Sequence, residues 1–372
     1  MRGIKSSFKA VSAAGILALV STAGILISAA DASSPRENAV PESPQYGLAE
    51  RYPGDDGIEA DSAVVFVENF ENGDISSLSE RWNSMINPDG QVLSFAEDAV
   101  PGGHGSRSIM LTATKGHDTG GDLWKLLDRG YDRLYARFYV KFAPDAPYVH
   151  HFVSMGGKTD SLTYPVGRAG FRPDGYDRFG SSLDLVRGNA DPPGKWSFYT
   201  YWCEMRSWQT AEGLSDGRPN AFYGNLFGPD KPEQAKRGQW QCVEMMIKLN
   251  TPPDGRDGEQ AFWIDGRPVG RWAPGSHIGR WFRDTFRTVP GNDGADADSS
   301  LTPFEGFLWR RTDRLKINVF RLQYYVAHIF EQNVKPDDPA IPYNSEKGWV
   351  RFDNVVLATR YIGPVKAKQE NR

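Results

Sequence analysis

The chain has 372 residues, of which 39% are hydrophobic, 24% charged and 12% aromatic, and it includes 39 glycines and 25 prolines. This composition excludes a disordered chain, and the many glycines and prolines exclude a coiled coil or helical repeat. A net charge of −4 argues against a nucleic-acid-binding protein, which would carry a basic surface. Two cysteines are too few for a disulfide scaffold or a thiolate zinc site.

The amino-terminal segment has the features of an export signal. A short basic start is followed by the apolar, uncharged residues 10–30, and Ala30-Asp-Ala32 offers the small residues of a cleavage site. We therefore expect residues 1–32 to be a signal peptide and the mature protein to be secreted or periplasmic, without membrane association. The alternative is an uncleaved anchor, because about 20 apolar residues can span a bilayer.

One folded domain is expected after this segment. Residues 33–61 are rich in proline, serine, glutamate and glycine and predict a flexible linker. Folded structure begins at the β-branched and aromatic run of residues 62–70 and ends near Pro364, and residues 365–372 form a charged tail. Because no repeat and no second linker interrupts them, residues 62–364 are interpreted as a single domain.

Alternation of apolar and polar residues predicts an antiparallel β-sandwich. The candidate strands cover residues 134–142, 240–249, 317–330 and 350–358, and residues 261–272 resemble a hairpin around Asp265-Gly266. Helical patterns are few, and residues 279–286 are one short candidate. Tyrosine and arginine recur on the polar faces of several strands, which favours a groove for a sugar chain over a merely solvated face.

The sequence has one segment that resembles a pair of catalytic carboxylates and one that could bind calcium. A strand of alternating carboxylates, as in sandwich-fold glycoside hydrolases, has its nearest counterpart in Ser182-Leu-Asp-Leu185, which lacks the partnering glutamates. Asp293, Asp296 and Asp298 offer hard oxygen ligands for a structural calcium ion, and an acidic surface loop is the alternative. We expect no obligatory cofactor.

The order of short motifs in the first half of the domain resembles a known enzyme group. The motifs are the strand of residues 131–142, His150-His151, Gly156-Gly157-Lys158, Arg172-Pro-Asp-Gly175, and Phe198-Tyr-Thr-Tyr201. This order resembles the alginate and glucuronan lyases of polysaccharide lyase families 14 and 20. Residues 315–318 and 350–364 look like the closing strands of that group. The resemblance implies an all-β, concanavalin-A-like β-jelly-roll sandwich of two curved antiparallel sheets with few short helices.

The resemblance also implies a function. It predicts a secreted polysaccharide lyase, active as a monomer, that cleaves an acidic, uronate-containing polysaccharide by β-elimination. Such an enzyme needs a base, an acid and a cation to offset charge on the substrate carboxylate. Lys158 matches the functional lysine of the group, and Tyr199 and Tyr201 match its tyrosine pair, which shares one face of a strand. A solvated lysine and ordinary cross-strand aromatics are the alternatives.

The adjacent histidines and a missing arginine complete the predicted site. His150 and His151 point to opposite faces if they lie in a strand, so we expect at most one in the groove and assign His151 a catalytic role. Ser182 stands where the group carries an arginine, so Arg168, Arg187 or Arg321 must supply that cation, or the protein is a non-catalytic carbohydrate-binding protein on the same fold. The candidate substrate-binding residues are His150, Arg168, Ser182, Arg321, Gln323 and Tyr325.

The two cysteines give a further prediction. Cys203 follows Tyr199 and Tyr201 at even spacing, and Cys242 lies on the outward side of the 240–249 strand. Because pairing is the first expectation for two cysteines in an exported protein, we predict a Cys203–Cys242 disulfide between neighbouring strands. Two free thiols are the alternative.

Overall fold

The structure is a computed structural model that describes residues 46–114, 119–160, 168–288, 300–326 and 347–368. The predicted signal peptide, residues 33–45 of the expected linker and the candidate calcium loop at Asp293–Asp298 lie outside these residues. Within the described ranges, no helix is both long enough and apolar enough to cross a membrane.

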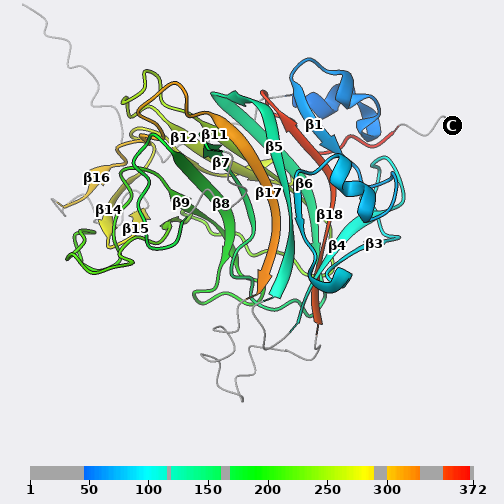
Figure 1. Ribbon diagram of the computed structural model, residues 1–372, viewed down its shortest axis with the longest axis horizontal. Coiled ribbons are helices and arrows are strands. Elements are labelled where there is room, and N and C mark those ends of the chain that lie inside the picture. The colour runs from blue at the N-terminus through cyan, green and yellow to red at the C-terminus, as the bar shows by residue number, and fades with distance from the viewer. Residues whose placement is uncertain (1–45, 115–118, 161–167, 289–299, 327–346, 369–372) are drawn as a thin grey trace, which may run out of the picture. The chain divides into compact units, whose positions relative to one another are not determined.

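Two large β-sheets form the domain (Figure 1). Sheet A has the strand order β13 (Arg267–Trp272), β12 (Glu259–Ile264), β11 (Gln241–Lys248), β6 (Arg133–Phe142), β18 (Lys347–Ala358), β4 (Ser108–Thr114) and β3 (Leu93–Ala96), with β1 (Val64–Glu68) also paired to β18. Sheet B has the order β16 (Thr302–Pro303), β14 (Ile278–Phe282), β15 (Thr285–Thr288), β10 (Asn225–Phe227), β9 (Lys195–Tyr201), β8 (Arg178–Val186), β7 (Val153–Lys158), β17 (Ile317–Val326), β5 (Thr119–Tyr131) and β2 (Ser84–Ile86). The pairings are antiparallel except for β10 with β15. The predicted all-β jelly-roll sandwich is confirmed.

Helical structure in the described residues is limited to short 3-10 turns. These are η1 (Leu48–Arg51), η2 (Pro53–Asp55), η3 (Ile58–Ala60), η4 (Ser76–Glu80) and η5 (Pro88–Gly90). The helix expected at residues 279–286 is wrong, because this segment forms β14 and β15. Trp281 and Phe286 pack against each other on the core side while Phe282 is exposed, which is the two-residue alternation of strands.

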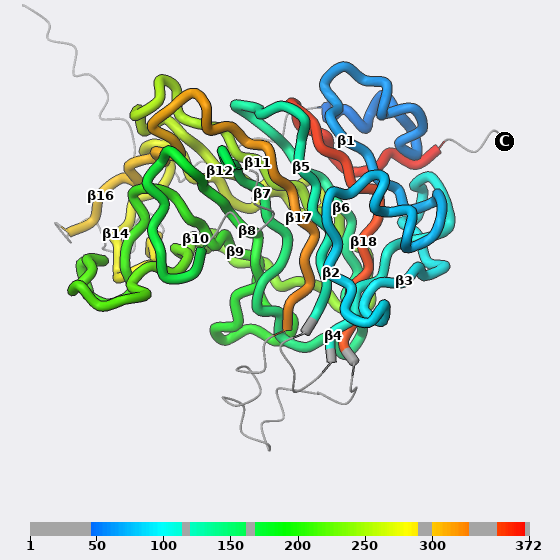
Figure 2. The backbone as a smooth tube through the Cα atoms, viewed as in Figure 1, coloured from blue at the N-terminus to red at the C-terminus, as the bar shows by residue number. Residues whose placement is uncertain are grey.

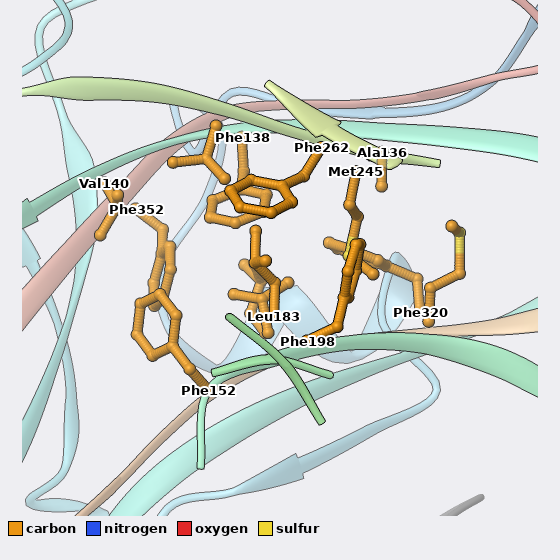
Figure 3. Packing of buried hydrophobic residues seen from close by; sticks show 14 of the residues in the cluster. Ala136, Phe138, Val140, Phe152, Leu183, Phe198, Met245, Phe262, Phe320 and Phe352 are labelled. Carbon is orange, nitrogen blue, oxygen red and sulfur yellow. The ribbon is translucent and has the colours of Figure 1, made fainter. Parts of the chain in front are cut away.

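The core lies between the inner faces of the two sheets (Figure 3). Phe138 of β6 and Phe352 of β18 come from sheet A, and Leu183 of β8 and Phe198 of β9 come from sheet B; all four are fully buried. Burying each such side chain stabilises the fold by roughly 1.5–3 kcal/mol. Side chains at the alternate positions of sheet B therefore point away from this core.

The predicted hairpin is confirmed by its turn geometry. Asp265 and Gly266 connect β12 to β13 with φ angles of 51° and 75°. Left-handed backbone at both central positions fits a type I′ turn, which matches the twist of the flanking strands. The segments expected at 134–142, 240–249 and 350–358 form β6, β11 and β18.

Residues 46–61 fall inside the expected linker, yet they are folded. Leu48 and Ile58 are buried against Val356 and Ile362 near the end of the domain. The backbone N–H of Gly54 also donates to the carbonyl of Lys366, at 2.7 Å. Figure 2 shows these amino-terminal turns beside the carboxy-terminal segment.

Two buried carboxyl groups on the outer side of sheet A make stability depend on pH. Burial raises the pKa of Glu244 from 4.5 to about 7 and the pKa of Asp353 from 3.8 to about 7. The native state then holds protons that the unfolded state has released. Their stabilising contribution is therefore complete below about pH 4 and is lost as the pH rises to about 7.

We expect the double variant Glu244→Gln/Asp353→Asn to lose this dependence. Between about pH 5 and about pH 8, the free energy of unfolding of the wild type should fall by on the order of 3 kcal/mol for each of the two carboxyl groups. The variant, which lacks both groups, should not show this fall. Chemical unfolding at both pH values measures the difference, and parallel pH profiles would contradict the assignment.

The predicted Cys203–Cys242 disulfide is wrong, because both cysteines are free and buried. Cys242 lies on the outer side of sheet A beside Tyr139, whereas Cys203 follows β9 of sheet B and its thiol donates to the carbonyl of Leu308, at 3.1 Å. The sandwich core separates the two residues, and sheets pack about 10 Å apart, beyond the reach of a disulfide. The even spacing predicts that Cys203 lies on one strand with Tyr199 and Tyr201, but β9 ends at Tyr201. The spacing also contains no information on which sheet holds the second cysteine.

Thiol titration checks this correction. We expect both thiols of the unreduced protein to react after denaturation and to react slowly in the native state. Burial raises the pKa of Cys203 to about 11 and also raises that of Cys242, so little reactive thiolate forms near neutral pH. Absence of reactive thiol in the denatured, unreduced protein would restore the disulfide.

Candidate active site

The side of sheet B that faces away from the core carries the predicted site; we call it the open face. Its central strands β9, β8, β7 and β17 direct every second side chain to this face, since the intervening residues belong to the core. The resulting polar set comprises Tyr199, Tyr201, Ser182, Asp184, Ser154, Lys158, Arg321, Gln323 and Tyr325.

His150 and His151 lie together, which differs from the expectation that they face opposite ways. Their ring centroids are 4.2 Å apart, and both rings contact Tyr325, at 5.3 and 6.1 Å. The reason is local: β7 begins only at Val153, and Phe152 and Val153 both point into the core. This break in alternation turns His151 to the open face.

Asp184 holds His151 in place. The Nδ1 atom of His151 lies 3.0 Å from Oδ2 of Asp184, and the other carboxylate oxygen accepts the backbone N–H of Phe152, at 2.8 Å. Asp184 is buried, whereas the His151 side chain is 32% exposed. A proton on Nδ1 directed at Asp184 leaves Nε2 of His151 as a hydrogen-bond acceptor.

Sequence reasoning missed Asp184 as a functional residue. A signal was present, because Asp184 alternates with Ser182 and is flanked by Leu183 and Leu185, so it shares the polar face of a central strand. Its partner lies 33 positions away in the chain, and this long-range contact is not visible in the sequence pattern.

The two tyrosines lie beside the histidine, on one face of β9 as strand parity predicts. The rings of Tyr199 and Tyr201 are 5.7 Å apart, and the ring of Tyr199 is 5.3 Å from that of His151. Burial raises the pKa of both phenols, and a hydrogen bond from Tyr199 partly lowers that of Tyr201. Both phenols are therefore protonated at neutral pH.

Lys158 ends β7 with a buried side chain. Its backbone N–H donates to the side-chain oxygen of Asn318, and its carbonyl accepts from the amide nitrogen of the same side chain, at 3.0 and 2.9 Å. Its amine makes no hydrogen bond to any described residue, and the nearest carboxylate, that of Asp160, is 3.9 Å away. Burial lowers the pKa of Lys158.

Strand register relates Lys158 to the tyrosines. Lys158 lies opposite Arg178 on β8, and the neighbouring row contains Gly156, Gly180 and Tyr201. Tyr201 thus lies in the row next to that of Lys158 and on the second strand from β7. The spacing of two strands separates the two residues by about 10 Å across the sheet. Two glycines occupy the row of Tyr201 on β7 and β8, and Arg178 is the β8 side chain next to the lysine.

The other cation positions predicted from the sequence are Arg321, Arg168 and Arg187. Arg321 pairs with the buried carboxylate of Asp122 and stacks on Trp124, with 4.5 Å from its guanidinium carbon to the ring centroid. Arg168 precedes β8 and lies over the ring of Phe171, and Arg187 follows β8 and lies over the ring of Tyr148.

Two predicted polar residues stand on the open face itself. Ser182 lies between Tyr199 and Ser154 in one row, and Gln323 lies on β17 between Arg321 and Tyr325. The structure therefore groups His150, His151, Tyr199, Tyr201 and Tyr325 around Asp184 and leaves Arg168 and Arg187 in flanking segments. Within the described residues, no group of three or more His, Cys, Asp or Glu side chains is placed to hold a metal ion.

The architecture defines an all-β jelly-roll protein with a polar cluster on one sheet. No protein-family model and no curated protein matches the sequence. The chain is similar in structure to alginate lyase Aly36B, with 14% identity, a TM-score of 0.43, and coverage of 82% of this chain and 98% of that one. Alginate lyase vAL-1 from Chlorella virus is 13% identical, with a TM-score of 0.46 and coverage of 79% of this chain and 100% of that one. The cellulose-induced protein Cip1 is 12% identical, with a TM-score of 0.42 and coverage of 80% of this chain and 99% of that one. These likenesses concern the fold alone.

Proposed function

We propose that this protein is a polysaccharide lyase that cleaves an acidic, uronate-containing polysaccharide by β-elimination on the open face of sheet B. The observation that carries the proposal is the placement of the Asp184-bound His151 beside the Tyr199–Tyr201 pair. A partly exposed imidazole acceptor and a protonated phenol on one face supply the base and the acid that elimination needs.

In the proposed elimination, His151 is the base and Tyr201 is the acid. Nε2 of His151 takes the proton from the carbon next to the uronate carboxyl group. The electrons of that C–H bond form a carbon–carbon double bond to C4, and the bond from C4 to the linking oxygen breaks. Tyr201 gives its phenolic proton to that leaving oxygen, so no water enters the product. Asp184 stabilises the imidazolium formed on His151.

Lys158 is the proposed source of positive charge for the substrate carboxylate. Negative charge builds on that carboxylate as the proton leaves, and a cation in a buried position stabilises such charge strongly. Its amine has no hydrogen-bond partner among the described residues, and Lys158 lies next to a row that contains Gly156 and Gly180. Arg178, beside Lys158 on β8, is a cation that the sequence interpretation did not include and that stands four residues before Ser182.

We expect Lys158→Met to separate function from stability. Methionine keeps most of the volume and removes the charge, so kcat should fall by about a hundredfold or more on a polyuronate that the wild type cleaves. Since the amine is buried and makes no hydrogen bond within the part of the chain that the structure describes, the unfolding midpoint should stay the same or rise. Full activity would remove Lys158 from the mechanism, and a large drop in the unfolding midpoint would assign it a structural role.

A non-catalytic carbohydrate-binding protein is the second candidate function. Two observations favour it: Ser182 carries no charge, and Arg321 is already paired with Asp122. Both functions use the same open face, and they differ in whether bound sugar is cleaved.

Incubation with alginate, glucuronan and polygalacturonate tests the proposal. The ultraviolet absorbance of the unsaturated product should rise with time for at least one of these polymers. Binding of a polymer without any rise in absorbance would favour the second function and overturn the lyase proposal.

A further inference from the structure

The open face continues beyond the candidate active site onto the β14–β15 hairpin. Tyr199 lies opposite Leu226 on β10, and Leu226 lies opposite Thr285 on β15. Thr285 in turn lies opposite Phe282 on β14. Since Phe286, next to Thr285, is buried in the core, these positions face outward. Phe282 is three strands from Tyr199, roughly 14 Å at the usual strand spacing.

The outward side of this hairpin carries arginines around an exposed ring. Phe282 is 40% exposed, and the guanidinium carbons of Arg287 and Arg283 lie 4.3 and 5.6 Å from its ring centroid. Arg280 lies directly opposite Arg287 across the hairpin, and all three arginines are exposed. We call Arg280, Phe282, Arg283 and Arg287 the hairpin patch.

The chemistry of the hairpin patch fits an acidic sugar chain. Phe282 is 40% exposed and offers apolar surface to a sugar ring, and the arginines around it offer paired donors for carboxylates. A polyuronate presents both features at every sugar unit.

We propose that the hairpin patch is a second binding site for acidic polysaccharide, several sugar units from the candidate active site along the same open face. The inference rests on the proposed function, because it assigns a remote part of the same polymer to the patch. Such a site strengthens binding of long chains through a second, linked contact and leaves short oligosaccharides unaffected.

The test compares two charge-reversal variants of the full chain. The variant Arg280→Glu/Arg287→Glu alters the hairpin patch. The control Arg133→Glu/Arg360→Glu makes the same change in net charge at exposed arginines in or just beyond strands of sheet A. Affinity electrophoresis measures binding to alginate, glucuronan and polygalacturonate. Calorimetry measures binding to an alginate trisaccharide, and the turnover of each polymer is measured in parallel.

The hairpin variant should bind polymer about tenfold more weakly than the control and bind the trisaccharide equally well. Phe282→Ala should weaken polymer binding at both low and high salt concentration, because salt screens the contribution of the charges but not that of the apolar ring. Polymer binding equal to that of the control, or no polymer binding by the wild type, would overturn the second site. Hairpin-dependent binding without turnover would overturn the lyase proposal and leave the second site supported.

Discussion

Tyr201→Phe should abolish measurable polysaccharide cleavage while the protein stays folded. The substitution removes one hydroxyl and almost no volume from a side chain that is 7% exposed. If the phenol protonates the leaving sugar oxygen, its loss removes a general-acid contribution of about 10²–10⁴ in rate. Initial rates of unsaturated-product formation measure the effect, and thermal unfolding confirms that the variant is folded.

Tyr135→Phe is the matched control for this prediction. Tyr135 is a partly buried tyrosine on β6 of sheet A, where its ring packs against Trp263. The control should keep wild-type activity. If Tyr201→Phe also retained activity, Tyr201 would have no part in proton transfer, and Tyr199 would be the remaining phenol to test.

Asp184→Asn should lower kcat by about a thousandfold or more with little change in KM. The asparagine oxygen can still accept the N–H of Phe152, and its amide group then faces Nδ1 of His151. A donor at that place forces the imidazole proton onto Nε2, so the histidine loses its acceptor toward the substrate. Steady-state kinetics with the cleaved polyuronate measure both constants.

His151→Gln is the companion variant, because the two residues act as one unit. Each single variant and the double variant should show nearly the same kcat, since losing either residue removes the same base. Additive losses in the double variant, or an Asp184→Asn protein that retains its kcat, would show that Asp184 does not act through His151.

The strands could be predicted where alternation is regular and long. β6 and β11 each place core residues at every second position, and the Asp265-Gly266 turn fixes a hairpin locally. The 279–286 segment was misassigned because two short strands and a tight turn offer too few positions to separate a two-residue period from a helical one.

The candidate site could be predicted in part. Tyr199 and Tyr201 follow strand parity, but the two histidines do not, because Phe152 and Val153 both enter the core and interrupt the alternation. Parity assigns a residue to a face of its own strand and contains no information on which strands become neighbours. For that reason neither the His151–Asp184 contact nor the separation of the two cysteines was visible before the sheets were known.

The most direct test of β-elimination on this open face is the mass of the product formed in water enriched in heavy oxygen. We expect oligosaccharides with an unsaturated end and no oxygen taken from the solvent, formed by the wild type and absent with Tyr201→Phe. Saturated products that carry solvent oxygen would mean hydrolysis and would contradict β-elimination.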